Sequence, residues 1–147
     1  MPYVPRLFLK TGIIYLATTF LLGAVLLVFE AAGRPAPFII SIEHGHMGFV
    51  GWVVNTVIGV ALWLLPVNRN AFPQTQGRYS EAATRGAFYL LNVGLLLRLF
   101  AEPVHAWHPA TATAAALVAA GLSQLAGVAI VAWTAWQRVF APPMRPI

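Results

Sequence analysis

The sequence contains no cysteine and very little charge. Four acidic and nine basic side chains are present among 147 residues, so only 9% of the chain is charged. The absence of cysteine excludes disulfides, thiolate metal ligands and thiol catalysis. A soluble domain typically has about 25% charged residues, so a soluble globular domain is excluded as well. The sequence also lacks the Gly-x-Ser-x-Gly, His-Glu-x-x-His and phosphate-loop motifs, which argues against the corresponding hydrolases and nucleotide-binding proteins.

Hydrophobic residues make up 59% of the chain and gather into four long segments. The segments cover approximately residues 11–30, 44–67, 84–102 and 112–136. Each approaches or exceeds the ~20 residues that a helix needs to cross a hydrocarbon layer about 30 Å thick. The connections are short and rich in proline or polar residues, as turns are. The sequence therefore predicts an all-α fold, an integral membrane four-helix bundle that forms a single domain over residues 1–147.

The basic residues predict how the bundle is oriented. Those before the first segment, in or beside the second connection and after the fourth segment share one side; they are Arg6, Lys10, Arg69, Arg78, Arg85, Arg138 and Arg145. Cytoplasmic loops are enriched in Lys and Arg, so we expect both termini on the cytoplasmic side of a bacterial or archaeal inner (plasma) membrane. This bias explains the net charge of +5. We expect no nucleic-acid partner, because the basic residues do not cluster on one soluble face.

The first segment also resembles a signal peptide, since Arg6 and Lys10 precede an apolar stretch. That stretch, residues 12–29, is longer than the about 7–15 residues of a signal-peptide core. We therefore expect it to be retained as the first span.

The second hydrophobic segment begins with two histidines one glycine apart, His44 and His46. At about 100° per helical residue, His46 points to nearly the opposite side of the helix from His44. The two therefore do not share one small metal ion, and each serves a different neighbour. The stripe below His44 contains Gly48, Gly51, Asn55 and Gly59. Such glycines either let another helix approach closely or let a large flat ring lie against the backbone.

All four histidines of the chain, which include His105 and His108 after the third segment, are expected toward the outer face. A histidine within or at the edge of a bilayer is costly and by default marks a functional site. Two histidines beside a glycine groove indicate axial ligation of a haem iron, which neutral imidazole binds well. The alternative is that both are interfacial side chains, hydrogen-bonded to lipid headgroups or loop carbonyls.

The stretch HGHMGFVGWVVNTVIGVALWLLP, residues 44–66, resembles a helix in the catalytic subunit of haem-copper oxidases, especially the cbb type. The matching positions are His44, His46, Gly48, Gly51, Trp52, Gly59, Leu64 and Pro66. In that family the first histidine ligates the high-spin haem and the second the low-spin haem, on opposite sides of one helix. The resemblance implies the same roles for His44 and His46, with Gly48 and Gly51 beside the cofactor.

The family's catalytic subunit consists of three four-helix units around a pseudo-threefold axis, and this chain resembles one such unit on its own. It has no His-His pair for the copper-binding helix and no candidate for the cross-linked His-Tyr pair. The resemblance therefore implies binding of haem b without the oxygen-reducing binuclear centre. A homotrimer would restore the missing neighbours.

Arg98 lies near the outer end of the third segment, where a guanidinium needs an anionic partner. That partner is either a haem propionate or Glu102, one helical turn away. His105 and His108, spaced i, i+3, would share a helical face and bind copper or zinc or close over a haem edge, or else be solvated. Pro103 and a second proline at position 109 argue against a long helix there.

Two further patterns concern packing. Four polar residues near mid-membrane predict interhelical hydrogen bonds; they are Asn55, Asn92, Ser123 and Gln124. Small residues recur at four-residue spacing in the fourth segment and favour a closely packed face; they are Ala115, Ala119, Ser123 and Gly127.

Three functions are consistent with these patterns. The first is a haem b protein, a homotrimer that accepts electrons from a respiratory donor or handles oxygen or nitric oxide, and any catalysis would be that of an oxidoreductase. The second is an outer copper or zinc site without haem, serving cofactor delivery or assembly; its ligands would be His44, His46, His105 and His108, with Glu43 and Glu102. The third is an accessory subunit that packs against a larger respiratory enzyme and binds nothing.

Overall fold

The computed structural model describes residues 1–139, and the predicted all-α fold is confirmed for them. The elements are α1 (Tyr3–Ala31), α2 (Phe38–His46), η1 (Met47–Val54), α3 (Asn55–Leu64), the short 3-10 helix η2 (Pro73–Thr75), α4 (Glu81–Trp107) and α5 (Thr111–Val139). α2, η1 and α3 form one continuous helical segment, in which η1 is a π-helix. This part of the chain contains no strand. Arg145, one of the basic residues used above for orientation, lies outside the described residues.

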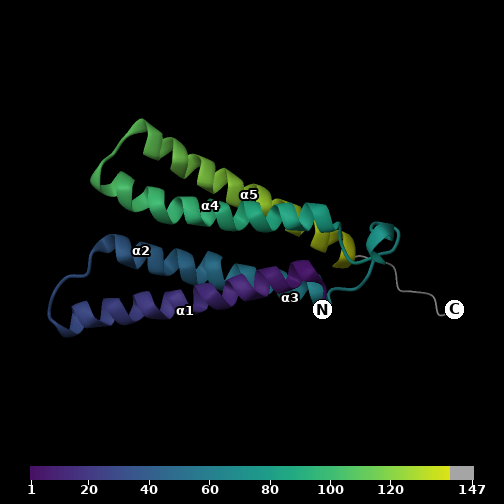
Figure 1. Ribbon diagram of the computed structural model, residues 1–147, viewed down its shortest axis with the longest axis horizontal. Helices are drawn as coiled ribbons and strands as arrows, with labels where there is room; N and C mark the ends of the chain where they lie inside the picture. Colours follow the sequence, from purple (N-terminus) through teal and green to yellow (C-terminus); the bar gives the residue numbers. More distant parts are fainter. Residues whose placement is uncertain (140–147) are drawn as a thin grey trace.

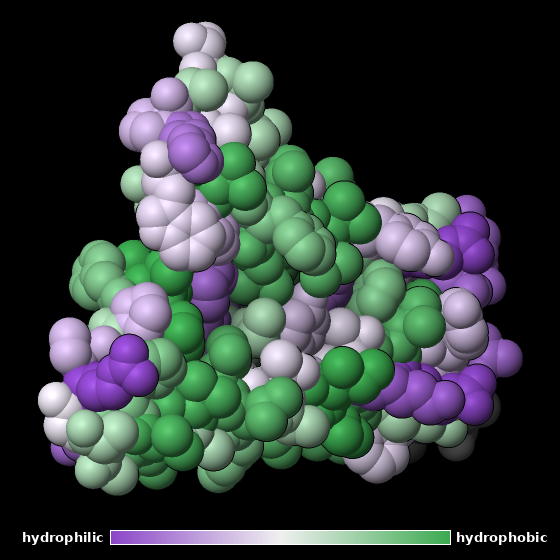
Figure 2. Space-filling view, turned by 60° about the vertical axis from the view of Figure 1, so that its left-hand side comes forward, coloured by the Kyte–Doolittle hydropathy of each residue, from purple (hydrophilic) through white to green (hydrophobic). Residues whose placement is uncertain are grey.

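Four helical segments are long and apolar enough to cross a membrane: α1, the segment Phe38–Leu64, α4 and α5. Hydrocarbon offers no hydrogen-bond partners, so a helix, which pairs its backbone groups internally, is the form that such apolar runs adopt there. Large hydrophobic side chains are exposed on the outside of the bundle, among them Phe20, Phe49 and Leu122. Figure 2 shows hydrophobic side chains over much of one face, with the hydrophilic ones gathered in a few patches. These are the properties of a multi-pass membrane protein.

The four segments form two antiparallel hairpins (Figure 1). α1 packs against the segment Phe38–Leu64, and α4 packs against α5. Fewer contacts join the hairpins, mainly where α4 meets α1, α2 and η1 and where α3 meets α5. The N-terminus and connection 65–80 lie at one end of the bundle, which we call the terminal end, and the turns 32–37 and 108–110 lie at the other, the histidine end. The helices spread apart toward the histidine end (Figure 1).

A buried arginine joins the two hairpins at the terminal end. Arg138 in α5 is 0% exposed. Its guanidinium donates hydrogen bonds to the carbonyl oxygens of Leu62 (2.9 Å), Pro66 (2.9 Å) and Leu65. The last carbonyls of a helix have no partner within it, and a charged donor binds them more strongly than a neutral one. Arg138 therefore caps α3 and attaches the second hairpin to the first.

The main hydrophobic core draws on both hairpins and on the connection 65–80. Its buried members are Val4, Phe8, Ile58, Leu62, Tyr79, Ala87, Leu91 and Val131. Tyr79 is the contribution of the connection, and burial raises the pKa of its phenol, so the side chain remains neutral in its apolar surroundings. The connection is therefore part of the packed structure.

Three of the four polar residues predicted to make hydrogen bonds between helices do so, whereas Nε2 of Gln124 is buried without a partner. Asn92 in α4 donates through Nδ2 to Oδ1 of Asn55 at 3.0 Å, and both side chains are buried. Ser123 in α5 donates through Oγ to the carbonyl oxygen of Leu90 in α4 at 2.7 Å. The first bond links the two hairpins, and the second links the two helices of one hairpin.

The predicted packing face of α5 is wrong in its outer part. Ala115 and Ala119 are exposed, whereas Ala120 and Gly127 are buried against α4. A four-residue step turns a helix by about 400°, so a row at this spacing drifts by ~40° with each step. The buried face continues instead through Val131 and on to Arg138.

The second helical segment begins six residues earlier than predicted, at Phe38 instead of His44. Pro37 precedes the first helical residue, where its fixed φ and missing N–H are tolerated, and apolar residues 38–42 continue into the helix. His44 and His46 therefore lie within the helix and not at its start. α1 likewise begins before residue 11, at Tyr3.

The expectation that Pro103 would prevent a long helix is also wrong, since α4 continues through it to Trp107. Proline removes one backbone donor, which a transmembrane helix tolerates where neighbouring groups satisfy the freed carbonyl. His105 consequently lies on α4, and His108 follows its last residue.

Replacing Arg138 with methionine should lower the free energy of unfolding by about 2–4 kcal/mol, because carbonyl groups at the end of α3 lose a charged donor. Arg85→Met is the matched control, since it removes the same charge from an exposed position at the same end. Thermal unfolding in detergent, followed by circular dichroism, measures both. Equal effects of the two substitutions would contradict the capping role.

Candidate functional site

A π-helix follows directly after the two histidines. Hydrogen bonds in a π-helix run from residue i to i+5, so its turn is wider than that of an α-helix. Where η1 returns to the α-helical pattern, the backbone hydrogen bonds change from i→i+5 to i→i+4. Asn55, the first residue of α3, supplies a further donor, because its Nδ2 donates to the carbonyl oxygens of Val50 (3.1 Å) and Gly51 (2.9 Å). π-Helical segments are rare and occur frequently at functional sites.

His44 faces α1 and has a fixed tautomer. Its Nδ1 lies 3.0 Å from the carbonyl oxygen of Thr19, and a carbonyl oxygen only accepts hydrogen bonds. In the neutral imidazole, Nδ1 therefore carries the proton and the lone pair is on Nε2. A histidine that binds a metal typically donates its other ring N–H to a carboxylate or a backbone carbonyl in this way. The half-buried ring lies beside Gly23, where a Cβ would come within 3.1 Å of its Cε1.

His44 also lines a groove of about 610 Å³ on the surface of the first hairpin. The other lining residues all belong to α1; they are Thr19, Phe20, Gly23, Ala24, Leu26 and Leu27. Small-molecule and cofactor sites usually measure about 300–1,000 Å³ and are largely apolar, with few polar groups. The groove meets both conditions, with His44 and Thr19 as its polar residues.

The glycines below His44 contact α1. A Cβ at Gly51 would lie 2.5 Å from Cγ of Tyr15, and one at Gly48 would lie 3.2 Å from Cγ2 of Thr19. Close approach of another helix was one of the two roles predicted for these glycines. The structure shows this role, with α1 as the helix that approaches.

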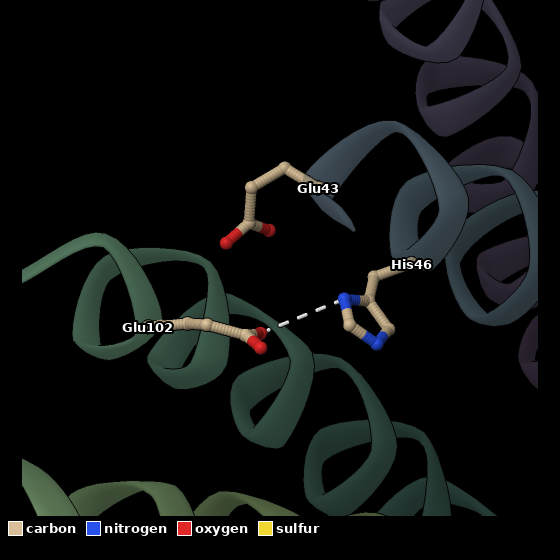
Figure 3. A group of neighbouring side chains, drawn as sticks. All are labelled: Glu43, His46 and Glu102. Carbon is tan, nitrogen blue, oxygen red and sulfur yellow. Dashed lines mark ion pairs between the residues drawn. The ribbon is translucent and has the colours of Figure 1, made fainter. Parts of the chain in front are cut away.

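His46 faces the opposite way, toward α4, and lies near Glu43 and Glu102 (Figure 3). Its Nδ1 is 3.6 Å from Oε2 of Glu102, which is too long for a hydrogen bond. Glu43 is only 8% exposed, and neither of its carboxylate oxygens has a hydrogen-bond partner. One potential ligand atom from each of the three residues lies within 4.8 Å of the other two. The predicted divergence of His44 and His46 is thus present in the structure.

Arg98 donates from Nε to Oε2 of Glu102 at 2.9 Å. Of its two predicted partners, a haem propionate and Glu102, the structure shows Glu102. The pair connects successive turns of α4, and its side chains are 33% (Arg98) and 20% (Glu102) exposed. It places a positive charge next to the carboxylates that face His46.

The remaining histidines lie elsewhere at the histidine end. Nδ1 of His105 is 2.7 Å from Oγ1 of Thr113, and His108 is exposed just beyond α4. Within residues 1–139, the one grouping of three or more His, Asp or Glu side chains that could hold a metal ion is Glu43, His46 and Glu102. The four histidines predicted as copper or zinc ligands therefore do not form a cluster. A cavity of about 450 Å³ between α2 and α4 is lined in part by Glu102 and His105.

No protein-family model matches the chain, and comparisons with curated proteins and with solved structures also find no match. The resemblance of residues 44–66 to the oxidase helix stays a prediction. The functional assignment therefore rests on the geometry of the site.

Substituting alanine for Gly51 should destabilise the protein, because the new Cβ would overlap Tyr15. We expect a loss of about 1–3 kcal/mol, typical of overpacking in a well-packed core. Gly45→Ala is the matched control six residues away, where a Cβ would meet nothing within 4 Å. Thermal unfolding of both variants in detergent tests the close contact between Gly51 and Tyr15. Equal stability of the two variants would contradict that contact.

Proposed function

We propose that the protein is a multi-pass membrane protein that binds haem b, with His44 as an axial ligand of the iron. The observation that carries this proposal is the hydrogen bond from Nδ1 of His44 to the Thr19 carbonyl. It leaves Nε2 as a neutral imidazole nitrogen with a free lone pair, which is the form of histidine that binds haem iron.

The residues around His44 fit a large flat cofactor. Gly23 and Ala24 leave space beside the imidazole, and the rest of the groove is mostly apolar. Low polarity excludes water and lowers the local dielectric constant, which are among the means by which a protein adjusts a haem. When bound, the haem would supply one-electron transfer and an iron centre for a diatomic gas.

The groove faces away from the rest of its own bundle, since α1 alone lines it apart from His44. Phe20 and Leu27 at the groove are exposed. We propose that a second copy of the chain covers the cofactor there, in a homotrimer whose copies each repeat the contact. The enrichment of basic residues at the terminal end supports placing that end in the cytoplasm, with the histidine end at the outer surface of a plasma membrane.

The physiological role that we propose is electron transfer from a respiratory donor or the handling of oxygen or nitric oxide. The two roles differ in whether the iron keeps an open position. Binding of carbon monoxide to the reduced protein would indicate gas handling. A reduced spectrum that carbon monoxide leaves unchanged would indicate an iron without an open position, as in a haem that transfers electrons.

His44→Ala should reduce the haem content of the purified protein by at least about tenfold, a loss that even an outer-shell partner of a metal ligand can cause. His108→Ala is the control, because it removes an exposed histidine at the same end of the bundle. The pyridine haemochrome assay and the Soret absorbance measure both variants.

A second variant separates loss of a ligand from loss of folding. His44→Gly leaves a space next to Gly23, and added imidazole should restore the Soret band there. Full haem content in His44→Ala, or no effect of imidazole on a folded His44→Gly protein, would contradict His44 as the ligand.

A further inference from the structure

The side of the helix opposite His44 carries a second group of potential ligands, supplied by both hairpins. Glu43 and His46 belong to α2, and Glu102 belongs to α4 (Figure 3). The two carboxylates and Nδ1 of His46 point into the same space, whereas Nε2 lies on the far side of the imidazole ring (Figure 3). This group is separate from the haem proposal, which uses the α1 side of the helix.

Three atoms in this group are buried without a hydrogen-bond partner: both carboxylate oxygens of Glu43 and Nδ1 of His46. Buried polar atoms are nearly always paired, and an exception calls for a water, an ion or a functional explanation. A proton on Glu43 would remove its charge but would leave Nδ1 of His46 without a partner. A cation shared by the three residues satisfies all of these atoms together.

The distances also suit a shared cation. Nδ1 of His46 and Oε2 of Glu102 are 3.6 Å apart, too far for a hydrogen bond. Two ligands that each lie about 2.1 Å from one tetrahedral ion are ~3.4 Å from each other. The spacing therefore resembles that of two ligands of one ion more than that of a donor and an acceptor.

The local charge favours a cation as well. Two glutamates face one arginine, Arg98, which already pairs with Glu102. With a neutral His46 the group has one uncompensated negative charge, and Glu43 is more than nine-tenths buried. Burying an unpaired charge is costly, so an additional positive charge at this place stabilises the fold.

We propose that Glu43, His46 and Glu102 bind a divalent first-row transition metal ion, of the class that includes zinc. An imidazole ligand favours such ions over magnesium and calcium, which prefer oxygen alone, and the carboxylates supply the charge. The bound ion joins α2 to α4 at the end of the bundle where the helices spread apart. It is a second site, independent of His44.

Zinc titration of the purified full-length protein tests the proposal. Isothermal titration calorimetry of metal-free protein with Zn²⁺ should give one site per chain. Glu43→Gln and Glu102→Gln should each raise Kd by more than about tenfold, the lower limit for loss of even an outer-shell partner. Glu30→Gln is the matched control, because Glu30 is an exposed glutamate at the same end of the bundle, and it should leave Kd unchanged.

Thermal unfolding distinguishes a bridge from adventitious binding. Zn²⁺ at a hundredfold excess over the wild-type Kd should raise the Tm of the wild type by about 5 °C or more, and at the same concentration it should raise the Tm of Glu102→Gln by about half as much or less. Equal Zn²⁺ affinity in Glu43→Gln, Glu102→Gln and Glu30→Gln would overturn the proposal, as would no binding to the wild type.

Different substitutions test the two proposed sites. His44→Ala should lose haem and keep the zinc site, whereas His46→Ala should lose the zinc site and keep the Soret band. Loss of the Soret band in His46→Ala, with zinc affinity unchanged, would make His46 a haem ligand and overturn the metal site.

Discussion

The guanidinium of Arg138 is the interaction on which the arrangement of the bundle depends. It is fully buried and bonds to carbonyls at the end of α3, so it fixes the second hairpin to the first at the terminal end. The main core and the bond between Asn55 and Asn92 continue that attachment toward the middle. Beyond this point the helices spread apart, and the groove beside His44 and the cavity next to Glu102 both lie in the spread half.

The segment Phe38–Leu64 supplies the chemistry of both proposed sites because it lies between two neighbours. α1 packs along one side and gives the Thr19 carbonyl to His44, and α4 approaches on the other side and gives Glu102 to His46. Both imidazoles direct Nδ1 at oxygen, but the pairs differ in kind. His44 makes a hydrogen bond that frees Nε2, whereas His46 lies beyond hydrogen-bond range of its carboxylate. This difference supports a haem at the first and a small cation at the second.

Much of the fold could be predicted from sequence, because hydrophobic run length and the 100° turn of a helix act locally. The four helical segments and the opposite directions of His44 and His46 follow from these rules. Other features depend on residues far apart in the chain. The cap made by Arg138 and the meeting of Glu43 with Glu102 require the packed bundle, and the partner of His44 is a backbone carbonyl, which every residue has. η1 could not be predicted either, because a π-helix changes the turn per residue that a helical wheel takes as constant.

We propose above that the groove beside His44 holds a haem. The most direct measurement is the visible absorption spectrum of the wild-type protein, purified in detergent from cells supplied with haem precursor, in its oxidised and dithionite-reduced forms. We expect a Soret band and sharp reduced bands of a b-type cytochrome, with a haem-to-chain ratio that reports whether copies share the cofactor. A folded protein that remains colourless would contradict haem binding beside His44.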